Sequence, residues 1–163
     1  MEIRLIKPSD TEKFVDFYKK LVRETDYLMF SPEEVSAKAD VEGKFIENYD
    51  DYKQVFIALD GDSIVGYLGI SRSRLAKMSH TAKITVGVLD DYKRQGIASK
   101  LIEFSQKWAK EKGIQRIELT VITKNEAAVS FFKETGFDRE GTRKNAVNIN
   151  NEVYDEYFMA KIV

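Results

Sequence analysis

The sequence has 163 residues, of which 43% are apolar and 33% charged, and its net charge is −1 at pH 7. This length and balance predict one compact domain over residues 1–163, and the charge excludes a general binder of nucleic acid or anionic membranes. The chain has no cysteine, which excludes disulfides, thiolate metal sites and a cysteine nucleophile. It also lacks an apolar run of membrane or signal-peptide length, so we expect a cytoplasmic protein.

The start of the chain predicts a strand followed by a helix. Residues 2–6 alternate between polar and apolar, and Pro8 ends the strand. A capping box at residues 9–12 starts the helix near Asp10. Four apolar side chains then recur at helical spacing on one face, which we expect to be buried: Phe14, Phe17, Tyr18 and Leu21.

The remaining sequence predicts one more helix and then alternating strands and helices. Ser31 caps the second helix, with Pro32 at its first position, and the helix runs to about Ile46. Further strands are expected at residues 54–59, 63–71, 81–89, 115–122, 137–147 and 152–162, and further helices at residues 97–112 and 125–135. The order βααβββαβαββ predicts a mixed α/β (α+β) domain with a mostly antiparallel central sheet.

Three local details accompany these elements. Gly87 is expected to mark a bulge in its strand, and residues 148–151 form the last turn. The helix at residues 97–112 is expected to bury Ala98, Leu101, Phe104 and Trp108.

A basic loop with one glycine joins the strand at residues 81–89 to the helix at residues 97–112. It reads Lys93-Arg94-Gln95-Gly96-Ile97-Ala98. A helix start presents unpaired backbone N–H groups and a partial positive charge, and glycine and alanine let a pyrophosphate approach closely. The loop is therefore a candidate phosphate cradle. The alternative is an ordinary turn into a helix with a solvated basic cap.

A second segment, at residues 125–137, favours the phosphate cradle over the ordinary turn. Its spaced residues are Asn125, Ala128, Phe131, Phe132, Gly136 and Phe137. Together the loop and this segment resemble the GNAT acetyltransferase superfamily, whose Q/R-x-x-G-x-G/A loop binds the CoA pyrophosphate and whose N-x-x-A-x-x-(L/F)-Y-x-x-x-G-F segment completes the cofactor site. The element order matches the GNAT fold over nearly the whole chain, with helices on both faces of the sheet. Residues 116–121, 141–144 and 153–160 resemble the branch that includes L-amino-acid N-acetyltransferases.

The resemblance implies a site for acetyl-CoA and no metal. The strand before the loop would pair with the pantetheine arm through Val86, Gly87 and Val88. The pyrophosphate would bind at Lys93, Arg94, Gln95, Gly96, Ile97, Ala98 and Ser99. Lys93 replaces the usual arginine or glutamine, and it keeps the charge without the planar fork. Asn125 would bind the pantetheine arm, cap its helix, or do both.

The usual acid and base of the family are both missing. Phe132 fills the position of the tyrosine acid and is expected in the core or beside the cofactor sulfur. Ala82 and Thr120 occupy the positions at which relatives carry a glutamate that acts as the general base. Glu118, on the same strand face as Thr120, is a candidate base through a water.

Each candidate for the missing groups has a structural alternative. Glu118 could instead pair with Arg72 or Lys83. His80 has a suitable ordinary pKa, although its position before a strand is typical of surface residues. Tyr154 and Tyr157 lie on the last strand, where tyrosines are common in cores.

The acceptor would lie across the sheet opening from CoA, between the first two helices and the last hairpin. The candidate residues there are Glu24, Tyr27, Met29 and Asn145, with Tyr18 and Asp26 as neighbours. Acidic and aromatic groups suit a cationic amine. For Tyr18 and the loop at residues 24–30, packing on the core is the alternative.

The resemblance predicts an N-acetyltransferase that moves an acetyl group from acetyl-CoA to a primary amine of a small molecule or peptide, by direct attack in a ternary complex. Its partners would be acetyl-CoA and the amine, and a homodimer is one expectation. A CoA-binding regulatory or catalytically degenerate GNAT module is the first alternative. An unrelated α/β nucleotide binder is the second, and the lack of a Walker lysine–serine pair disfavours it.

Overall fold

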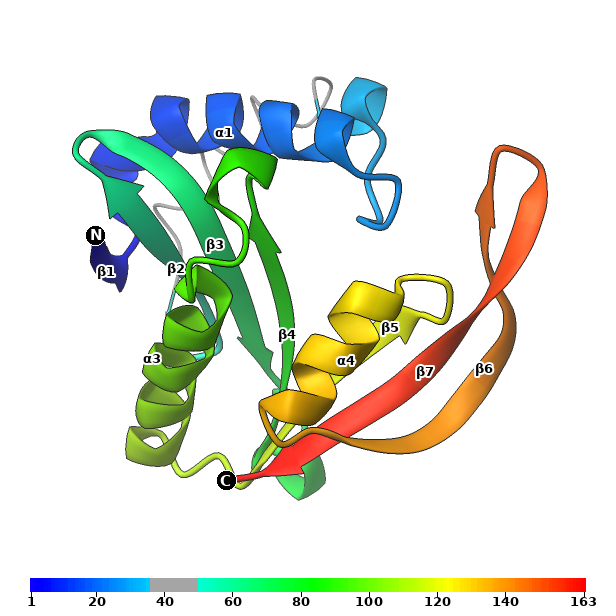
Figure 1. Cartoon of the computed structure of the whole chain (residues 1–163). Coiled ribbons are helices and arrows are strands. Elements are labelled where there is room, and N and C mark those ends of the chain that lie inside the picture. The colour runs from blue at the N-terminus through cyan, green and yellow to red at the C-terminus, as the bar shows by residue number, and fades with distance from the viewer. Residues whose placement is uncertain (36–49) are drawn as a thin grey trace.

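The computed structural model describes residues 1–35 and 50–163. Their helices and strands are β1 (Glu2–Leu5), α1 (Thr11–Glu24), β2 (Lys53–Asp60), β3 (Ser63–Arg72), β4 (Thr81–Val88), α3 (Ile97–Glu111), β5 (Arg116–Ile122), α4 (Glu126–Glu134), β6 (Asp138–Ile149) and β7 (Glu152–Ile162), with 3₁₀ turns η1 (Pro8–Asp10), η2 (Ala76–Met78) and η3 (Asp90–Tyr92). This confirms the expected mixed α/β fold (Figure 1).

The expected second helix is described only at its start. Residues 32–35 are helical. Ser31 Oγ accepts a hydrogen bond from the Glu34 N–H at 3.3 Å, and Glu34 Oε2 accepts one from the Ser31 N–H at 2.7 Å. This reciprocal capping confirms the predicted start. The rest of the expected helix, to Ile46, lies outside the described residues.

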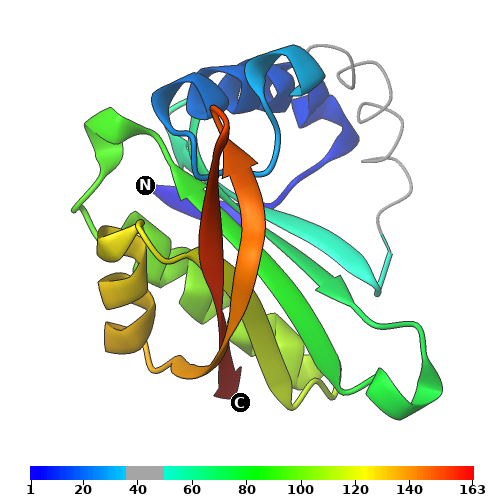
Figure 2. The ribbon, with the colours of Figure 1, turned by 90° about the vertical axis from the view of Figure 1, so that its right-hand side faces the viewer.

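One sheet organises the described part of the chain. Its seven strands run in the order β1-β2-β3-β4-β5-β7-β6. All neighbours are antiparallel except β4 and β5, which pair in parallel. The β6–β7 hairpin projects away from the rest of the sheet in Figure 1, and in Figure 2 it lies in front of the sheet, toward the viewer.

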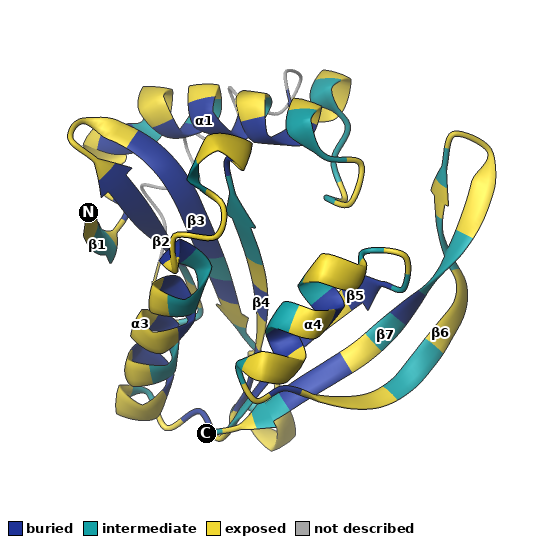
Figure 3. Cartoon of the chain, viewed as in Figure 1, coloured by how far each residue is buried: buried dark blue, intermediate teal, exposed yellow. Residues whose placement is uncertain are grey.

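Each face of the sheet carries its own core. On one face, the side chains of α3 and α4 pack on the sheet around Leu68, Leu101 and Phe132. On the other face, α1 packs its predicted apolar stripe against β2 and β3, with Tyr67 at the centre of an aromatic cluster. The buried stripe along α1 and α3 is visible in Figure 3. Helices on both faces leave the sheet edges and the strand ends to form the site.

Several local predictions are wrong. The carboxylate of Asp10 turns back to η1 and β1, and no side-chain hydrogen bond caps α1, so the capping box at residues 9–12 does not form. Phe104 is 46% exposed because it lies on the solvent side of α3, and Ala98 is only half-buried. The last turn is shorter than expected because β6 continues to Ile149. Asn150 and Asn151 alone make it, both with positive φ.

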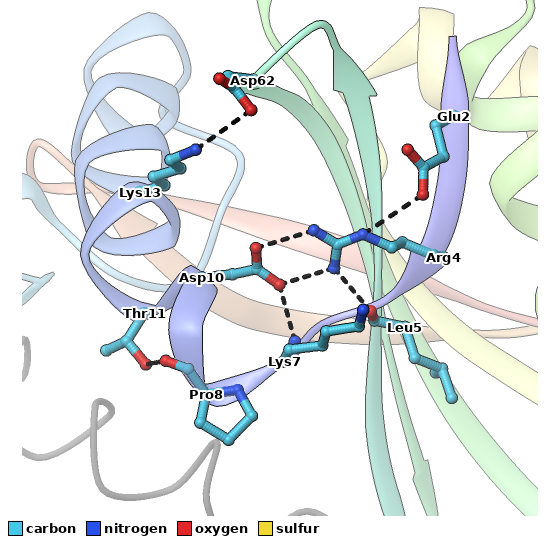
Figure 4. A network of polar contacts seen from close by, with 9 residues as sticks. All are labelled: Glu2, Arg4, Leu5, Lys7, Pro8, Asp10, Thr11, Lys13 and Asp62. Carbon is cyan, nitrogen blue, oxygen red and sulfur yellow. Dashed lines mark hydrogen bonds and ion pairs between the residues drawn. The ribbon is translucent and has the colours of Figure 1, made fainter.

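The buried carboxylate of Asp10 is tied to the first strand (Figure 4). It accepts hydrogen bonds from Arg4 Nη1 at 2.7 Å, from Arg4 Nη2 at 2.9 Å and from the Lys7 N–H at 2.8 Å. The bond from Arg4 is the largest cause that lowers the pKa of Asp10, and the Lys7 amide adds to it. Charge-assisted, bidentate bonding of this kind fixes the start of α1 against β1.

We predict that Asp10→Asn lowers the free energy of unfolding by about 2 kcal/mol at neutral pH, because Arg4 loses its charged partner. A carboxyl with a lowered folded-state pKa stabilises the fold above its unfolded pKa, and this contribution is lost as the pH falls through the folded value. The difference between wild type and variant should therefore shrink below about pH 4. Urea unfolding at a series of pH values measures it.

Asp62→Asn is the matched control, because Asp62 is exposed and pairs with Lys13 at 3.6 Å. Its effect should stay below about 0.5 kcal/mol. Equal effects of the two substitutions would contradict the role assigned to the Arg4–Asp10 pair.

Candidate functional site

Strands β4 and β5 pair only at their beginnings. Their register covers Thr81↔Arg116, Ala82↔Ile117 and Lys83↔Glu118, and the strands then separate (Figure 1). No described strand pairs with this edge of β4 from Ile84 to Val88. An unpaired strand edge presents backbone N–H and C=O groups that can bind an extended ligand. The expected pantetheine residues, Val86 to Val88, lie on this edge.

The basic loop leads from β4 into α3. Its backbone turns with positive φ at Arg94 (60°) and at Gly96 (76°), where Gly96 directly precedes α3. A methyl group added to Gly96 would meet no atom within 4 Å, so the space in front of the loop is open. The first-turn amides of α3 have no acceptor inside the helix and can bind an anion. The loop therefore has the geometry of the expected phosphate cradle.

One pocket of about 1220 Å³ joins the open edge, the loop and the hairpin. This volume exceeds that of a typical small-ligand site, so it can hold a long ligand arm and a second molecule together. Of the residues expected to bind acetyl-CoA, all except Gln95 line it: Val86, Gly87, Val88, Lys93, Arg94, Gly96, Ile97, Ala98, Ser99, Asn125 and Phe132.

Gly87 is not a bulge, contrary to the prediction. It pairs with Tyr67 of β3 in a regular register that has no shift along β3 and β4. A Cβ at this position would come within 2.7 Å of Leu21 Cδ2 and 2.9 Å of Tyr67 Cε1. Glycine is needed because α1 and β3 approach the backbone of β4 closely at the open edge.

The start of α4 forms the opposite wall of the opening. Asn125 Oδ1 accepts a hydrogen bond from the Ala128 N–H at 3.3 Å, which confirms its predicted role as the helix cap. Phe132 is buried and packs edge-on against Phe137 with ring centroids 5.7 Å apart. It has no proton to donate, and it presents an apolar surface to the pocket.

The loop after α1 and the last hairpin bring acidic and aromatic groups to the far end of the pocket. These residues are Asp26, Tyr27, Met29, Glu152 and Tyr154. The Tyr154 hydroxyl donates to Glu152 Oε2 at 2.7 Å, and this bond is the main cause that raises the pKa of Tyr154. The ammonium of Lys124 lies 4.8 Å from the centre of the Tyr154 ring. This acidic end contrasts with the basic loop at the start of α3.

Glu24 lines the pocket, but its carboxylate already contacts two other residues. Glu24 Oε2 accepts a hydrogen bond from the Asp90 N–H at 2.8 Å, and Glu24 Oε1 lies 3.8 Å from Lys20 Nζ. The contact joins the end of α1 to η3, just before the basic loop. Lys93, in turn, bonds the carboxylate of Asp90, so part of its charge is neutralised. Glu24 thus positions the loop.

Three other candidate residues lie outside the pocket. The carbonyl oxygen of His80 accepts bonds from the Gln115 and Arg116 N–H groups at the closed end of the sheet. Glu118 accepts a bond from Arg116 Nε at 3.0 Å and lies 4.0 Å from Lys83, which matches the structural alternative. Asn145 has a φ of 49° at an irregularity of β6. Only Tyr154 of the three catalytic candidates reaches the pocket.

The sequence analysis missed Glu156, a buried residue of β7 that also lines the pocket. The only hint in the sequence was a charged residue within a predicted strand, and the sequence does not tell which face of the sheet that residue occupies.

Within the described part of the chain, no group of three or more His, Cys, Asp or Glu side chains could hold a metal ion. No helix of residues 1–35 and 50–163 is long and apolar enough to cross a membrane.

Comparison with known proteins agrees with this geometry. Residues 3–158 match the model of the acetyltransferase (GNAT) domain. The L-amino acid N-acetyltransferase AaaT of Escherichia coli (strain K12) is 37% identical over 114 residues, 68% of this chain and 68% of that protein. An acetyltransferase of the GNAT family from Streptococcus pneumoniae superposes with a TM-score of 0.93 at 26% identity, over 99% of both chains. The yncA protein of Salmonella typhimurium, solved with acetyl-CoA, has a TM-score of 0.86 at 17% identity, over 99% of this chain and 93% of that one.

We predict that Gly87→Ala destabilises the fold by about 1–3 kcal/mol, because the added methyl group overpacks the contact with Leu21 and Tyr67. Thermal and urea unfolding measure the loss. Gly69→Ala is the control, since a Cβ there would approach its nearest neighbour only to 3.9 Å. If both alanine variants unfold like the wild type, the close approach of α1 to β4 is not a constraint.

We predict that Glu24→Ala weakens acetyl-CoA binding several-fold while the KM of the amine changes little, because the loss of one charge-assisted bond frees the loop from α1. Titration calorimetry and steady-state kinetics separate the two effects. Asp16→Ala removes an exposed carboxylate of the same helix and should change neither. A raised amine KM with unchanged acetyl-CoA binding would instead make Glu24 an acceptor residue.

Proposed function

Because the chain belongs to the GNAT acetyltransferase family, we propose that it transfers an acetyl group from acetyl-CoA to a primary amine of a small molecule or peptide in a ternary complex. One observation carries the proposal: a single pocket connects the unpaired edge of β4 and the amide-rich start of α3 with an acidic end at the last hairpin. A long anionic donor and a cationic acceptor can therefore meet in the opening between β4 and β5.

The donor half uses backbone groups more than side chains. The edge from Val86 to Val88 would pair with the pantetheine arm as a further strand does. Amides from Gly96 to Ser99 would bind the pyrophosphate, with charge added by Arg94. Lys93 contributes less, since Asp90 already binds it. Asn125 would keep its cap and also border the arm.

Acetyl-CoA supplies the thioester carbonyl that the neutral amine attacks. The chain orients the two molecules, and such positioning can supply roughly 7–11 kcal/mol of the barrier. A positioned acid contributes about 10²–10⁴ in rate. The replacement of the family tyrosine by Phe132 is therefore compatible with turnover. Tyr154 lines the acceptor end and carries a phenolic proton at neutral pH, so it is a candidate donor there, although its bond to Glu152 raises its pKa and so weakens it as an acid.

AaaT, which matches this chain over two thirds of its length, is an L-amino acid N-acetyltransferase by name. Free amino acids are thus the first acceptors to test, followed by peptide N-termini and polyamines. A cytoplasmic location and a homodimer stay predictions.

A CoA-binding module without transferase activity is the second candidate function, and Phe132 at the position of the usual acid favours it. The two functions differ in one measurement, the release of CoA thiol when acetyl-CoA and an amine panel are incubated with the protein. Turnover excludes the module, whereas binding of acetyl-CoA without turnover excludes the enzyme.

We predict that acetyl-CoA binds the wild type in a calorimetric titration and that Arg94→Ala weakens this binding about tenfold, because one phosphate contact is lost. Lys107→Ala is the matched control: it removes one positive charge from the exposed side of α3, outside the pocket. Absence of binding to the wild type at high micromolar acetyl-CoA would overturn the proposed function.

A further inference from the structure

Glu156 of β7 is a buried residue that lines the pocket and has one partner for its carboxylate. It is only 1% exposed. Its Oε2 accepts one bond, from Arg143 Nη1 at 3.3 Å, and the Arg143 side chain is itself 57% exposed. Among the described residues, no hydrogen bond engages Oε1. We propose that Glu156 binds the ammonium group of the acceptor and takes its proton.

Asp10, the other buried carboxylate described above, has more hydrogen bonds than Glu156. Both carboxylates are buried, at 7% exposure for Asp10 and 1% for Glu156. Asp10 accepts three bonds of 2.7–2.9 Å, two of them from one arginine, and so has what a buried charge needs (Figure 4). Glu156 has one long bond. Because the structure has no sealed side-chain oxygen without a partner among the described residues, the unbonded Glu156 Oε1 is open to the pocket and can accept a hydrogen bond from a ligand.

The register of the sheet places Glu156 on the face opposite the basic loop. Directly paired residues share a face, and the side alternates along a strand. Lys83 of β4 pairs with Glu118 of β5, and Glu118 pairs with Ala160 of β7, so these three residues share a face. Gly87 is four residues after Lys83 and Glu156 is four residues before Ala160, so both lie on that same face. At Gly87 this is the side of α1, because a Cβ there would meet Leu21. α3 and its loop pack on the other face.

An acceptor bound at Glu156 would therefore approach the opening from the α1 side while the donor occupies the α3 side. Glu156 is opposite Ile122, the last residue of β5, where β4 and β5 have already separated. The pocket runs through this opening and includes both residues. This arrangement suits an amine that attacks a thioester lying between the two strands.

The surroundings of Glu156 favour a cation. Three other carboxylates lie at the same end of the pocket, those of Glu24, Asp26 and Glu152, together with the phenols of Tyr27 and Tyr154. The cations near this end are Lys124, which follows β5, and Arg143 of β6. Arg143 pairs with Glu156 itself, and Glu24 is bound to the Asp90 N–H and lies near Lys20. The remaining charges at this end, Asp26 and Glu152 against Lys124, are acidic on balance, so the acceptor class is a primary amine that enters as its ammonium ion.

This inference rests on the proposed function, and its chemical balance is simple. One N–H bond of the ammonium breaks and a Glu156 O–H bond forms, which leaves a lone pair on nitrogen. This lone pair forms the C–N bond to the thioester carbonyl carbon, and the C–S bond breaks. The CoA sulfur leaves with the electrons of that bond and takes a second proton from the amine nitrogen. Glu156 returns its proton to water when the amide leaves.

Glu156→Gln tests the role, because the amide keeps the shape and can still accept the bond from Arg143. We expect kcat to fall about 10²–10⁴-fold while the Kd of acetyl-CoA changes less than about threefold. The deficit should shrink about tenfold per pH unit up to the pKa of the amine, because only free amine then reacts. A variant that keeps kcat/KM within about threefold of the wild type would overturn the proposal.

Two further variants separate chemistry from structure. Glu140→Gln changes a carboxylate that also bonds an arginine across strands, Arg116, but lies outside the pocket; its kinetics should match the wild type. Arg143→Met removes the bond that Glu156 accepts, and kcat should stay within about tenfold. If Glu156 serves only to anchor Arg143, the methionine variant will lose as much activity as Glu156→Gln, and that result overturns the proposal.

Binding of L-leucinamide to the CoA-loaded protein distinguishes this inference from the proposed function. The wild type should bind this ammonium compound, and Glu156→Gln should bind it at least about tenfold more weakly. If the wild type acetylates no amine but the difference in binding remains, the transferase function fails and the ammonium site stands. Equal binding by both proteins rules out the site even when turnover is observed.

Discussion

The parting of β4 from β5 after three paired residues is the constraint on which the rest of the site depends. A continuous ladder would satisfy the backbone of β4 from Ile84 to Val88 and would leave no room between the strands. Separation instead exposes a strand edge inside the molecule, where α1 covers one face and α3 the other. The helices stabilise this edge without pairing with it. Gly87 shows how tight the support is, since even one methyl group would collide with α1 and β3.

The two sides of the opening differ in charge because different elements form them. The loop before α3 contributes Arg94 and helix amides, whereas the hairpin and the loop after α1 contribute Asp26, Glu152 and Glu156. The bond from the Asp90 N–H to Glu24 connects these halves, so α1 touches both the acidic end and the basic loop. The same helix therefore holds the basic loop in place and bounds the acidic end of the pocket.

Sequence reasoning predicted the elements because they depend on local patterns, whereas the donor residues were expected from the resemblance to the GNAT family. Alternation, helical spacing, turn glycines and a cap such as Asn125 are physical preferences of neighbouring residues. The errors came from contacts between residues of different elements. Asp10 bonds Arg4 of β1 instead of capping its helix, and Gly87 relieves a clash with α1 and β3 instead of forming a bulge.

The acceptor half depends almost entirely on such contacts. Strand alternation tells that Tyr154 and Glu156 share a face, but only the order β5-β7-β6 brings that face to the opening. The family tyrosine would act from α4, where Phe132 now packs against Phe137. Because phenylalanine at this position has no proton to give, we infer that proton transfer comes from the other wall of the pocket. The last hairpin has a buried carboxylate and a phenol on neighbouring positions of one face of β7, and these two groups are the reason that we propose β7 as the strand that carries proton transfer.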